Sequence, residues 1–164
     1  MKTIIIRGVP GTGKTLIANH IRKILPNSEL ICVDEFKLKA MEEKKDFQES
    51  LKIAYKESIK KLHLINKKHK NYIILEEIIN YEYFFRKILK FVNDAKVPSY
   101  WFRLMRPLKK LLEVEAITDR PIKNDVNDFD NLKREIESIK IKNEHIIKND
   151  DVMLTVKKIL EIIR

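Results

Sequence analysis

Apolar residues occur along this chain in short runs that alternate with longer segments in which apolar positions recur at helical spacing. The short runs predict buried strands at Thr3–Arg7, Glu29–Val33, Tyr72–Leu75, Val97–Leu104 and His145–Lys148. The helical spacing predicts helices at Lys14–Leu25, 35–45, Phe47–Lys68, Tyr81–Val92, 107–116 and Phe129–Ile139, and a last helix after Asp150 or Asp151. Five strands with long connections favour an α/β fold of three layers, with a doubly wound, parallel five-stranded sheet.

The length of 164 residues predicts one domain, spanning residues 1–164. No internal repeat and no low-complexity linker interrupts the alternation of strands and helices. The stretch Ile117–Asp128 is polar and has little to bury, so we expect a mobile loop there.

A glycine-rich segment joins the first predicted strand to the first predicted helix. Residues 8–15 match the pattern G-x-x-x-x-G-K-[ST], which defines the P-loop of nucleotide-binding proteins, and all three glycines of the chain lie within them. The backbone N–H groups of such a loop and the positive end of the following helix bind phosphate. We therefore expect ATP or GTP to be held by Gly8, Val9, Pro10, Gly11, Thr12, Gly13, Lys14, Thr15 and Leu16. Lys14 would reach the β- and γ-phosphates, and the Thr15 hydroxyl group would bind Mg²⁺.

Acidic residues follow the second and third predicted strands. Asp34 comes after Cys32-Val33, and Glu76-Glu77 end the run Ile73-Ile74-Leu75. Ligands of parallel sheets bind at the carboxyl ends of the strands, so these side chains should share one site with the P-loop. We predict that Glu76 holds Mg²⁺, and Glu77 is the competing candidate.

The order of elements, the P-loop and the segment Cys32–Lys37 together resemble the small P-loop kinases, in particular the group of polynucleotide 5′-kinases, seryl-tRNA kinases and zeta toxins. The resemblance implies that Asp34 is the general base that deprotonates the acceptor hydroxyl group. It also implies that Lys37 and Arg86 bind the acceptor, although the group usually has arginine where Lys37 stands. A helix cap is the alternative role of Asp34, and a solvated helix face is the alternative position of Arg86.

The same resemblance implies a lid at about residues 113–128. Kinases of this group carry two lid arginines about four residues apart, but between Leu112 and Pro121 this chain has only Arg120. We predict that Arg120 stabilises charge in the transition state; a surface position before a proline turn is the alternative. The segment that begins at Asp119 also resembles the lids of nucleoside monophosphate and dephospho-coenzyme A kinases, so the acceptor class stays open.

Three functions follow from these features. The first is transfer of the γ-phosphoryl group of ATP to a hydroxyl acceptor, either a small molecule such as a nucleoside or a nucleic-acid 5′ end. The second is a nucleotide kinase with a phosphate acceptor. The third is a regulatory P-loop ATPase, because the loop sequence Gly-x-Pro-Gly-Thr-Gly-Lys-Thr is also common in AAA+ proteins.

The net charge of +10 is concentrated in the first half of the chain, where Lys52–Lys70 holds seven lysines and one acid, Glu57. This helix could attract nucleic acid, and a solvated face is the alternative. The single cysteine, Cys32, excludes an internal disulfide and predicts a buried structural thiol. No run of about 18 apolar residues exists and the N-terminus has no signal sequence, so we expect a cytoplasmic protein without membrane contact. The sequence predicts no stable protein partner.

Overall fold

The computed structural model describes residues 1–119 and 123–164 and is built around one five-stranded sheet. The strands are β1 (Lys2–Arg7), β2 (Ser28–Cys32), β3 (Tyr72–Glu77), β4 (Ser99–Met105) and β5 (His145–Lys148). Their order across the sheet is β2-β3-β1-β4-β5, and every neighbouring pair is parallel. The chain passes from β1 to the edge strand β2, returns through β3, and continues with β4 and β5 on the other side of β1, so the predicted doubly wound parallel sheet is confirmed.

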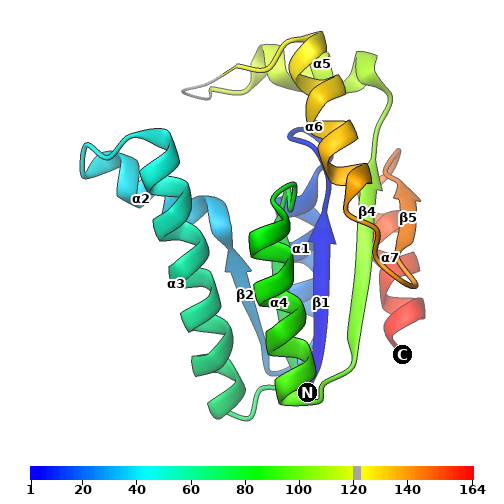
Figure 1. Cartoon of the computed structure of the whole chain (residues 1–164). Coiled ribbons are helices and arrows are strands. Elements are labelled where there is room, and N and C mark those ends of the chain that lie inside the picture. Colours follow the sequence, from blue (N-terminus) through cyan, green and yellow to red (C-terminus); the bar gives the residue numbers. More distant parts are fainter. Residues whose placement is uncertain (120–122) are drawn as a thin grey trace.

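Helices cover both faces of this sheet, as Figure 1 shows. One face packs against α1 (Lys14–Ile24) and α7 (Val152–Ile163), and the other face packs against α3 (Phe47–Lys67) and α4 (Glu82–Ala95). A short α2 (Val33–Glu42) leads from β2 into α3. The hairpin of α5 (Leu108–Ile117) and α6 (Val126–Ser138) stands above the carboxyl ends of the strands in Figure 1.

The core divides into one apolar cluster on each side of the sheet. Successive strand residues point to opposite faces. In β3, Ile74 therefore joins the cluster beneath α1 and α7, whereas Ile73 and Leu75 join the cluster beneath α3 and α4. A third, smaller cluster joins the P-loop to the α5–α6 hairpin through Val9, Leu111, Phe129 and Ile136. The hairpin is thus packed against the loop by apolar contacts.

The loop expected at Ile117–Asp128 is shorter than predicted. Helix α5 includes Ile117, and α6 already begins at Val126. The reason is a reciprocal capping box: the Asp125 carboxylate accepts a hydrogen bond from the Asp128 N–H, and the Asp128 carboxylate accepts one from the Asp125 N–H. Two acids that made the stretch look like a polar loop in fact start the helix.

Two strand ends also differ from expectation. Strand β2 ends at Cys32, so Val33 and Asp34 already belong to α2. Strand β3 continues through both acids to Glu77, so these side chains take strand geometry rather than following the strand. In the parts of the chain that the structure describes, no helix has the length and apolar character needed to span a membrane.

Candidate active site

The backbone of the P-loop requires glycine at positions where the loop touches its neighbours. Gly13 has φ 90°, and a Cβ atom placed there would lie 2.7 Å from Nδ2 of Asn149. A Cβ atom at Gly8 would lie 2.6 Å from the carbonyl oxygen of Leu104 in β4. Both distances are shorter than any side chain tolerates, so the loop can fit between β4 and the start of α7 only with glycine at these positions.

The N-terminus of α1 has no side-chain cap, as is also true of α2, α4 and α5. Asp46, Asp125 and Asp151 each cap a helix by accepting a hydrogen bond from a backbone N–H, but the cap residue of α1 is Gly13, which has no side chain to do so. The first turn of α1 also contains no acid. Its N–H groups and the positive end of the helix dipole are therefore left for an anion, which is the arrangement that binds phosphate.

The P-loop side chains are already arranged around one backbone oxygen. The carbonyl oxygen of Val9 accepts hydrogen bonds from the Thr12 hydroxyl group (2.8 Å) and from Nζ of Lys14 (3.3 Å). Lys14 is only 9% exposed, so its ammonium group is held inside the loop. Pro10 is half-buried, and the Leu16 side chain is 52% exposed, so only the backbone N–H of Leu16 is suited to contact phosphate.

The predicted metal ligands Thr15 and Glu76 are in direct contact. The Thr15 hydroxyl group donates to Oε1 of Glu76 (3.0 Å), and the Cys32 thiol donates to the same oxygen (2.7 Å). The register of β2 on β3 pairs Cys32 with Glu76, which explains this second contact. Burial and the charge of Glu76 raise the pKa of Cys32 well above its usual value, so the thiol stays protonated and acts as a donor.

These residues fit Mg²⁺, which prefers oxygen ligands and keeps several of its waters. One hydroxyl group and one buried carboxylate supply the protein's share of such a site. No group of three or more His, Cys, Asp or Glu residues with metal-binding geometry occurs among the described residues.

Glu77, the competing metal candidate, lies on the opposite face of β3 from Glu76 and Thr15. It is 4% exposed, and its Oε1 accepts a hydrogen bond from the N–H of Ile78 (2.8 Å). Burial and the charge of Asp34 raise the pKa of Glu77 to about 7, while the charges of Lys37 and Lys14 oppose the shift. Glu77 therefore belongs to the side of the site occupied by Asp34 and Lys37.

The two residues expected to act on the acceptor contact one another. Nζ of Lys37 forms an ion pair with Oδ1 of Asp34, one turn apart in α2. Lys37 also lies over the ring of Phe47, 5.5 Å from its centroid. The cap residue of α2 is Cys32, and no side chain caps this helix, so the alternative role of Asp34 as a cap is wrong. The Asp34 side chain is half exposed, so a ligand can reach it from solvent.

Two expected site residues are not joined to this group. Arg86 lies on the exposed face of α4, where it pairs with Glu82 one turn earlier (2.7 Å). This is the solvated position given above as its alternative, and no contact described in the structure links Arg86 to Asp34 or Lys37. Arg120 falls outside the described residues, so its role stays a prediction.

Two residues that the sequence did not single out hold the P-loop in place. Asn149, which is fully buried after β5, donates to the carbonyl oxygen of Thr12 (2.7 Å) and accepts from the Thr155 hydroxyl group (2.9 Å). Arg106, just after β4, donates to the carbonyl oxygens of Gly11 (3.1 Å) and Asn149 (2.9 Å). Neither residue belongs to a recognisable motif, because their roles depend on strands that are distant in sequence.

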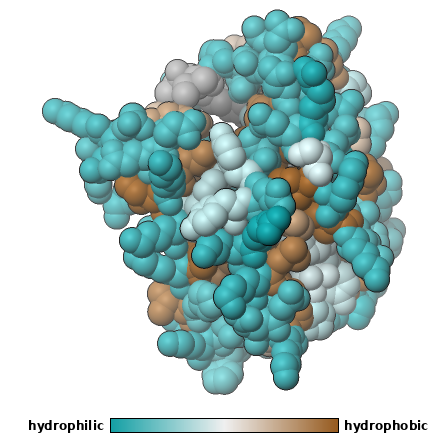
Figure 2. All heavy atoms as spheres, in the orientation of Figure 1, coloured by the Kyte–Doolittle hydropathy of each residue, from teal (hydrophilic) through white to brown (hydrophobic). Residues whose placement is uncertain are grey.

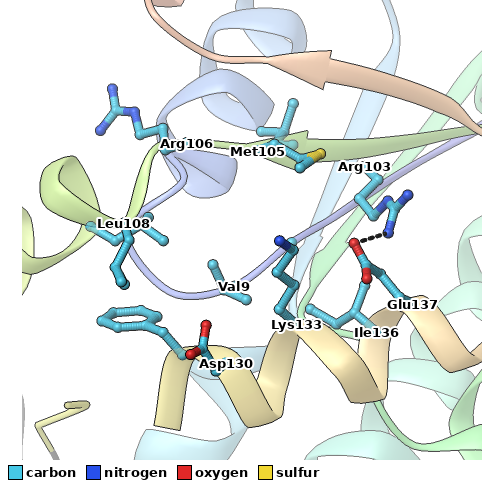
Figure 3. Close-up of a pocket in the computed structure, with 13 residues that line it drawn as sticks. Val9, Arg103, Met105, Arg106, Leu108, Asp130, Lys133, Ile136 and Glu137 are labelled. Carbon is cyan, nitrogen blue, oxygen red and sulfur yellow. Dashed lines mark ion pairs between the residues drawn. The ribbon is translucent and has the colours of Figure 1, made fainter. Parts of the chain in front are cut away.

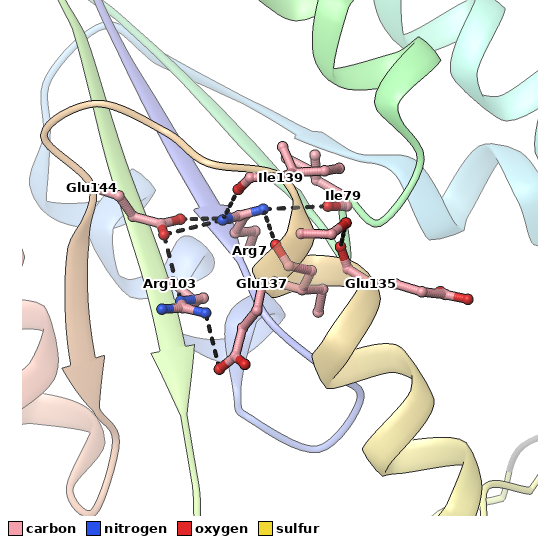
Figure 4. A network of polar contacts seen from close by, with 9 residues as sticks. Arg7, Ile79, Arg103, Glu135, Glu137, Ile139 and Glu144 are labelled. Atoms are coloured by element: carbon pink, nitrogen blue, oxygen red, sulfur yellow. Dashed lines mark hydrogen bonds and ion pairs between the residues drawn. The ribbon is translucent and has the colours of Figure 1, made fainter.

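A buried arginine fixes the strand that leads into the P-loop, as Figure 4 shows. Arg7 is completely buried; its guanidinium group pairs with Glu144 and donates to the carbonyl oxygens of Ile136 and Ile139 (each 3.0 Å). Arg103 of β4 extends the network to the same Glu144 (3.4 Å). The buried charge is thereby paired and hydrogen-bonded, as its burial requires. The network anchors the end of α6 to β1.

Between the P-loop and the α5–α6 hairpin lies a cavity of about 110 Å³. Figure 3 shows Val9, Leu108 and Met105 around it, with the Lys133 side chain entering from α6. The cavity lies directly beside Gly8 and Val9, so the hairpin is in contact with the loop without filling the space beside it.

Comparison with solved structures shows the same fold over nearly the whole chain. The tunicamycin resistance protein of Deinococcus radiodurans has a TM-score of 0.70 and 19% identity, covering 99% of this chain and 95% of the other. Kti12 of Chaetomium thermophilum, solved in complex with ADP-AlF3, has a TM-score of 0.69 and 13% identity, covering 98% and 96%. A gluconokinase of Sinorhizobium meliloti has a TM-score of 0.60 and 12% identity, covering 98% and 90%. At these identities the similarity shows the fold alone.

No curated protein matches the sequence significantly. The sequence does match the AAA domain family, over residues 1–121, a range that includes the P-loop, both strand-end acids of β3 and the end of β4. With a kinase-like P-loop fold over its full length and this family match over most of it, the chain belongs to the AAA domain family of P-loop proteins.

Proposed function

We propose that this protein is an ATP-dependent phosphotransferase that moves the γ-phosphoryl group to a hydroxyl acceptor. The observation that carries the proposal is that the P-loop follows β1 and the Asp34–Lys37 ion pair follows β2, both at the carboxyl end of the parallel sheet. Ligands of parallel sheets bind at this end. The ammonium group expected to bind the γ-phosphate and the carboxylate expected to deprotonate an acceptor therefore belong to the same edge of the sheet.

In this proposal each residue of the site has a separate role in the reaction. The uncapped N-terminus of α1 and the P-loop N–H groups bind the β-phosphate, and Lys14 follows the γ-phosphoryl group as it moves. Asp34, held by Lys37, takes the proton of the acceptor hydroxyl group. The acceptor oxygen forms a bond to the γ-phosphorus as the bond from this phosphorus to the bridging oxygen of ADP breaks. Arg120 would neutralise charge that develops on the transferred group.

Thr15 and Glu76 would hold Mg²⁺ on the side of the phosphates opposite to Asp34 and Lys37. The ion supplies positive charge that stabilises the β- and γ-phosphate oxygens during transfer. The Cys32 thiol fixes Oε1 of Glu76 in the position that faces Thr15. The side chains that serve the metal and the side chains that serve the acceptor thus lie on opposite faces of β3.

A regulatory ATPase is the second candidate, and membership in the AAA domain family favours it. In that case water would take the place of the acceptor. A nucleotide kinase with a phosphate acceptor is less well supported, because Lys37 is paired with Asp34 and Arg86 with Glu82. Exposed lysines of α3, among them Lys52, Lys56 and Lys60, keep a nucleic-acid 5′ end among the possible hydroxyl acceptors.

The test is a transfer assay with γ-labelled ATP, Mg²⁺ and a panel of nucleosides, sugars, nucleotides and 5′-hydroxyl oligonucleotides. We expect label in a hydroxyl acceptor, with GTP as a competitor to establish the preferred nucleotide. Steady release of labelled phosphate without transfer to any acceptor would support the ATPase and exclude the kinase.

Two variants connect this assay to the site. Asp34→Asn should reduce transfer to a hydroxyl acceptor roughly 100- to 10,000-fold, the usual contribution of a general base, while ATP binding is kept. Lys14→Ala should abolish the thermal stabilisation of the protein by ATP. If Asp34→Asn transfers at the wild-type rate, Asp34 is not the base.

A further inference from the structure

A buried hydroxyl group and a buried carboxylate lie on the same side of β3, the acceptor side, and the steps described above use neither. Tyr55 of α3 is 6% exposed, and its hydroxyl group has no hydrogen-bond partner in the described part of the chain. Tyr55 packs in the same apolar cluster as Leu75 and Ile79, the residues two positions before and after Glu77. Burial and the neighbouring charge of Glu77 also raise the pKa of Tyr55 above its usual value. A buried polar group without a partner is costly to folding and therefore needs an explanation.

The Tyr55 ring is held in one orientation by two other aromatic rings. It stacks on Phe84 with the centroids 4.1 Å apart, and it meets the edge of Tyr81 at 6.2 Å. Tyr81 is 41% exposed, so this aromatic group extends from the core to the surface. Figure 2 shows this face of the molecule, hollowed between the α2–α3 corner and the α5–α6 hairpin. An aromatic surface beside hydrogen-bonding groups suits the ring of a small organic ligand.

The turn after Glu77 has an unusual backbone that is kept by contacts elsewhere. Ile79 has φ 54°, a left-handed conformation that β-branched residues rarely adopt, and its side chain is fully buried. Figure 4 shows Arg7 directed toward the carbonyl oxygen of Ile79 (3.5 Å), and Asn80 donates to Glu135 of α6 (2.7 Å). Strain of this kind concentrates at functional sites. Here the contacts of Ile79 and Asn80 hold the backbone turn that joins Glu77 to Tyr81.

The charges around Tyr55 do not suit an anionic acceptor. Glu77 and Asp34 are both acids, Lys37 is already paired with Asp34, and Lys14 belongs to the phosphates of the nucleotide. The arginines described at this end of the sheet are engaged elsewhere, with Glu144 or with P-loop carbonyl groups. A phosphate group placed beside Glu77 would meet like charge without a bidentate partner.

We infer that Tyr55 and Glu77 form the subsite that recognises the acceptor, and that this acceptor is an uncharged compound with neighbouring hydroxyl groups, such as a free sugar or the ribose of a nucleoside. The inference rests on the proposed function. The Tyr55 hydroxyl group donates to one acceptor oxygen, and the Glu77 carboxylate accepts from a neighbouring hydroxyl group. Asp34 is then left to deprotonate the hydroxyl group that reacts.

The variant that tests this most sharply is Tyr55→Phe, which keeps the stacked ring and removes only the hydroxyl group. Because that group has no partner within the protein, the variant should unfold at the same temperature as the wild type or at a higher one. Its KM for the acceptor should nevertheless rise roughly tenfold, with kcat changed less than about twofold, as expected for one lost hydrogen bond to substrate. The matched control is Ser58→Ala, which removes another buried hydroxyl group without a partner from the same helix.

The assay uses full-length protein with γ-labelled ATP and Mg²⁺. Its acceptors are ribose, glucose and four ribonucleosides, each beside its phosphorylated form, and the 2′,3′-dideoxynucleosides. We expect the enzyme to phosphorylate the neutral vicinal diols and to transfer much more slowly to their phosphorylated forms. The Glu77→Gln variant should show a smaller ratio between these two rates. Comparing the transfer rates to the free sugars with those to the ribonucleosides shows whether the diol belongs to a sugar or to a nucleoside.

Each outcome decides the inference. Transfer to a neutral diol with an unchanged KM in Tyr55→Phe and in Glu77→Gln would overturn the subsite and leave the proposed function intact. Preference for the phosphorylated compounds would also overturn the subsite. Transfer to no member of this panel would overturn the subsite, and absence of transfer to 5′-hydroxyl oligonucleotides as well would overturn the proposed function. An equal rise of KM in Ser58→Ala would show that the effect is structural and would overturn the subsite as well.

Discussion

Glu76 and Glu77 are consecutive residues of β3, and both are almost completely buried, yet they belong to two different regions of the molecule. Glu76 faces α1, where the Thr15 hydroxyl group and the Cys32 thiol both donate to its carboxylate. Glu77 faces α3, where its neighbours are the acid Asp34 and an unpaired Tyr55 hydroxyl group. The first carboxylate is satisfied by donors within the protein, and the second is raised in pKa by burial and a like charge.

The difference follows from strand geometry and from what each face must bind. Adjacent strand residues point to opposite faces, so two identical side chains can serve two ligands. The two donors to Glu76 hold Oε1 of its carboxylate beside the Thr15 hydroxyl group, and carboxylate and hydroxyl oxygens are ligands that suit Mg²⁺. Glu77 accepts a hydrogen bond from the backbone N–H of Ile78 and is buried beside another acid, Asp34. We interpret the Glu76 region as the metal side and the Glu77 region as the acceptor side.

The largest expected effect is a change in the Mg²⁺ dependence of activity, which should differ between variants of Glu76 and Glu77. Glu76→Gln should lower the rate of phosphoryl transfer or ATP hydrolysis roughly 100-fold and raise the Mg²⁺ concentration needed for half-maximal activity, because the amide is a weaker metal ligand. Glu77→Gln should leave that Mg²⁺ concentration unchanged. Activity measured over a Mg²⁺ titration checks both; a stronger Mg²⁺ effect in Glu77→Gln would reverse our assignment of the two acids.

A second prediction concerns stability and pH. The pKa of Glu77 is about 7 in the folded protein against 4.5 for an ordinary glutamate, so between these values the folded state binds more protons than the unfolded state. Stability therefore falls as the pH rises from about 4.5 to 7 and the loss is complete above that range. At about 1.4 kcal/mol for each tenfold change in proton affinity, the full loss is about 3 kcal/mol.

Glu77→Gln removes this titration, so its melting temperature should exceed that of the wild type by a margin that grows from pH 5 to pH 8. Thermal unfolding across this range measures the margin. The exposed Glu82→Gln variant on α4 is the control and should show a constant, small difference. Parallel curves for Glu77→Gln and the wild type would mean that Glu77 titrates normally.

The smallest expected effect concerns the Cys32 thiol, the second hydrogen-bond donor to Glu76. Cys32→Ala removes the thiol contact and should raise the Mg²⁺ requirement only a few-fold, since Thr15 still donates to the same oxygen. Cys32→Ser retains a donor and should behave like the wild type. If both variants match the wild type, the thiol contact does not orient Glu76.

Much of the fold could be predicted because it depends on local pattern. The short apolar runs predicted all five strands, and the glycine-rich segment predicted the loop, because both signals lie in contiguous residues. The boundaries near Asp125 and Asp128 were missed because acids favour loops in composition but also cap helices in the right geometry. The pairing of Arg7 with Glu144, 137 residues later, left no signal at all in the sequence.

By itself, the sequence determined the phosphate-binding loop and the presence of acids at the ends of two neighbouring strands, because backbone conformation and strand direction follow from adjacent residues. Only the tertiary structure decided what those acids face. The register of β2 on β3 brings Cys32 to Glu76, and the packing of α3 brings Tyr55 to Glu77. Residues far apart in the chain meet only when the sheet and its helices pack together. The division between a metal side and an acceptor side is therefore a property of the folded protein.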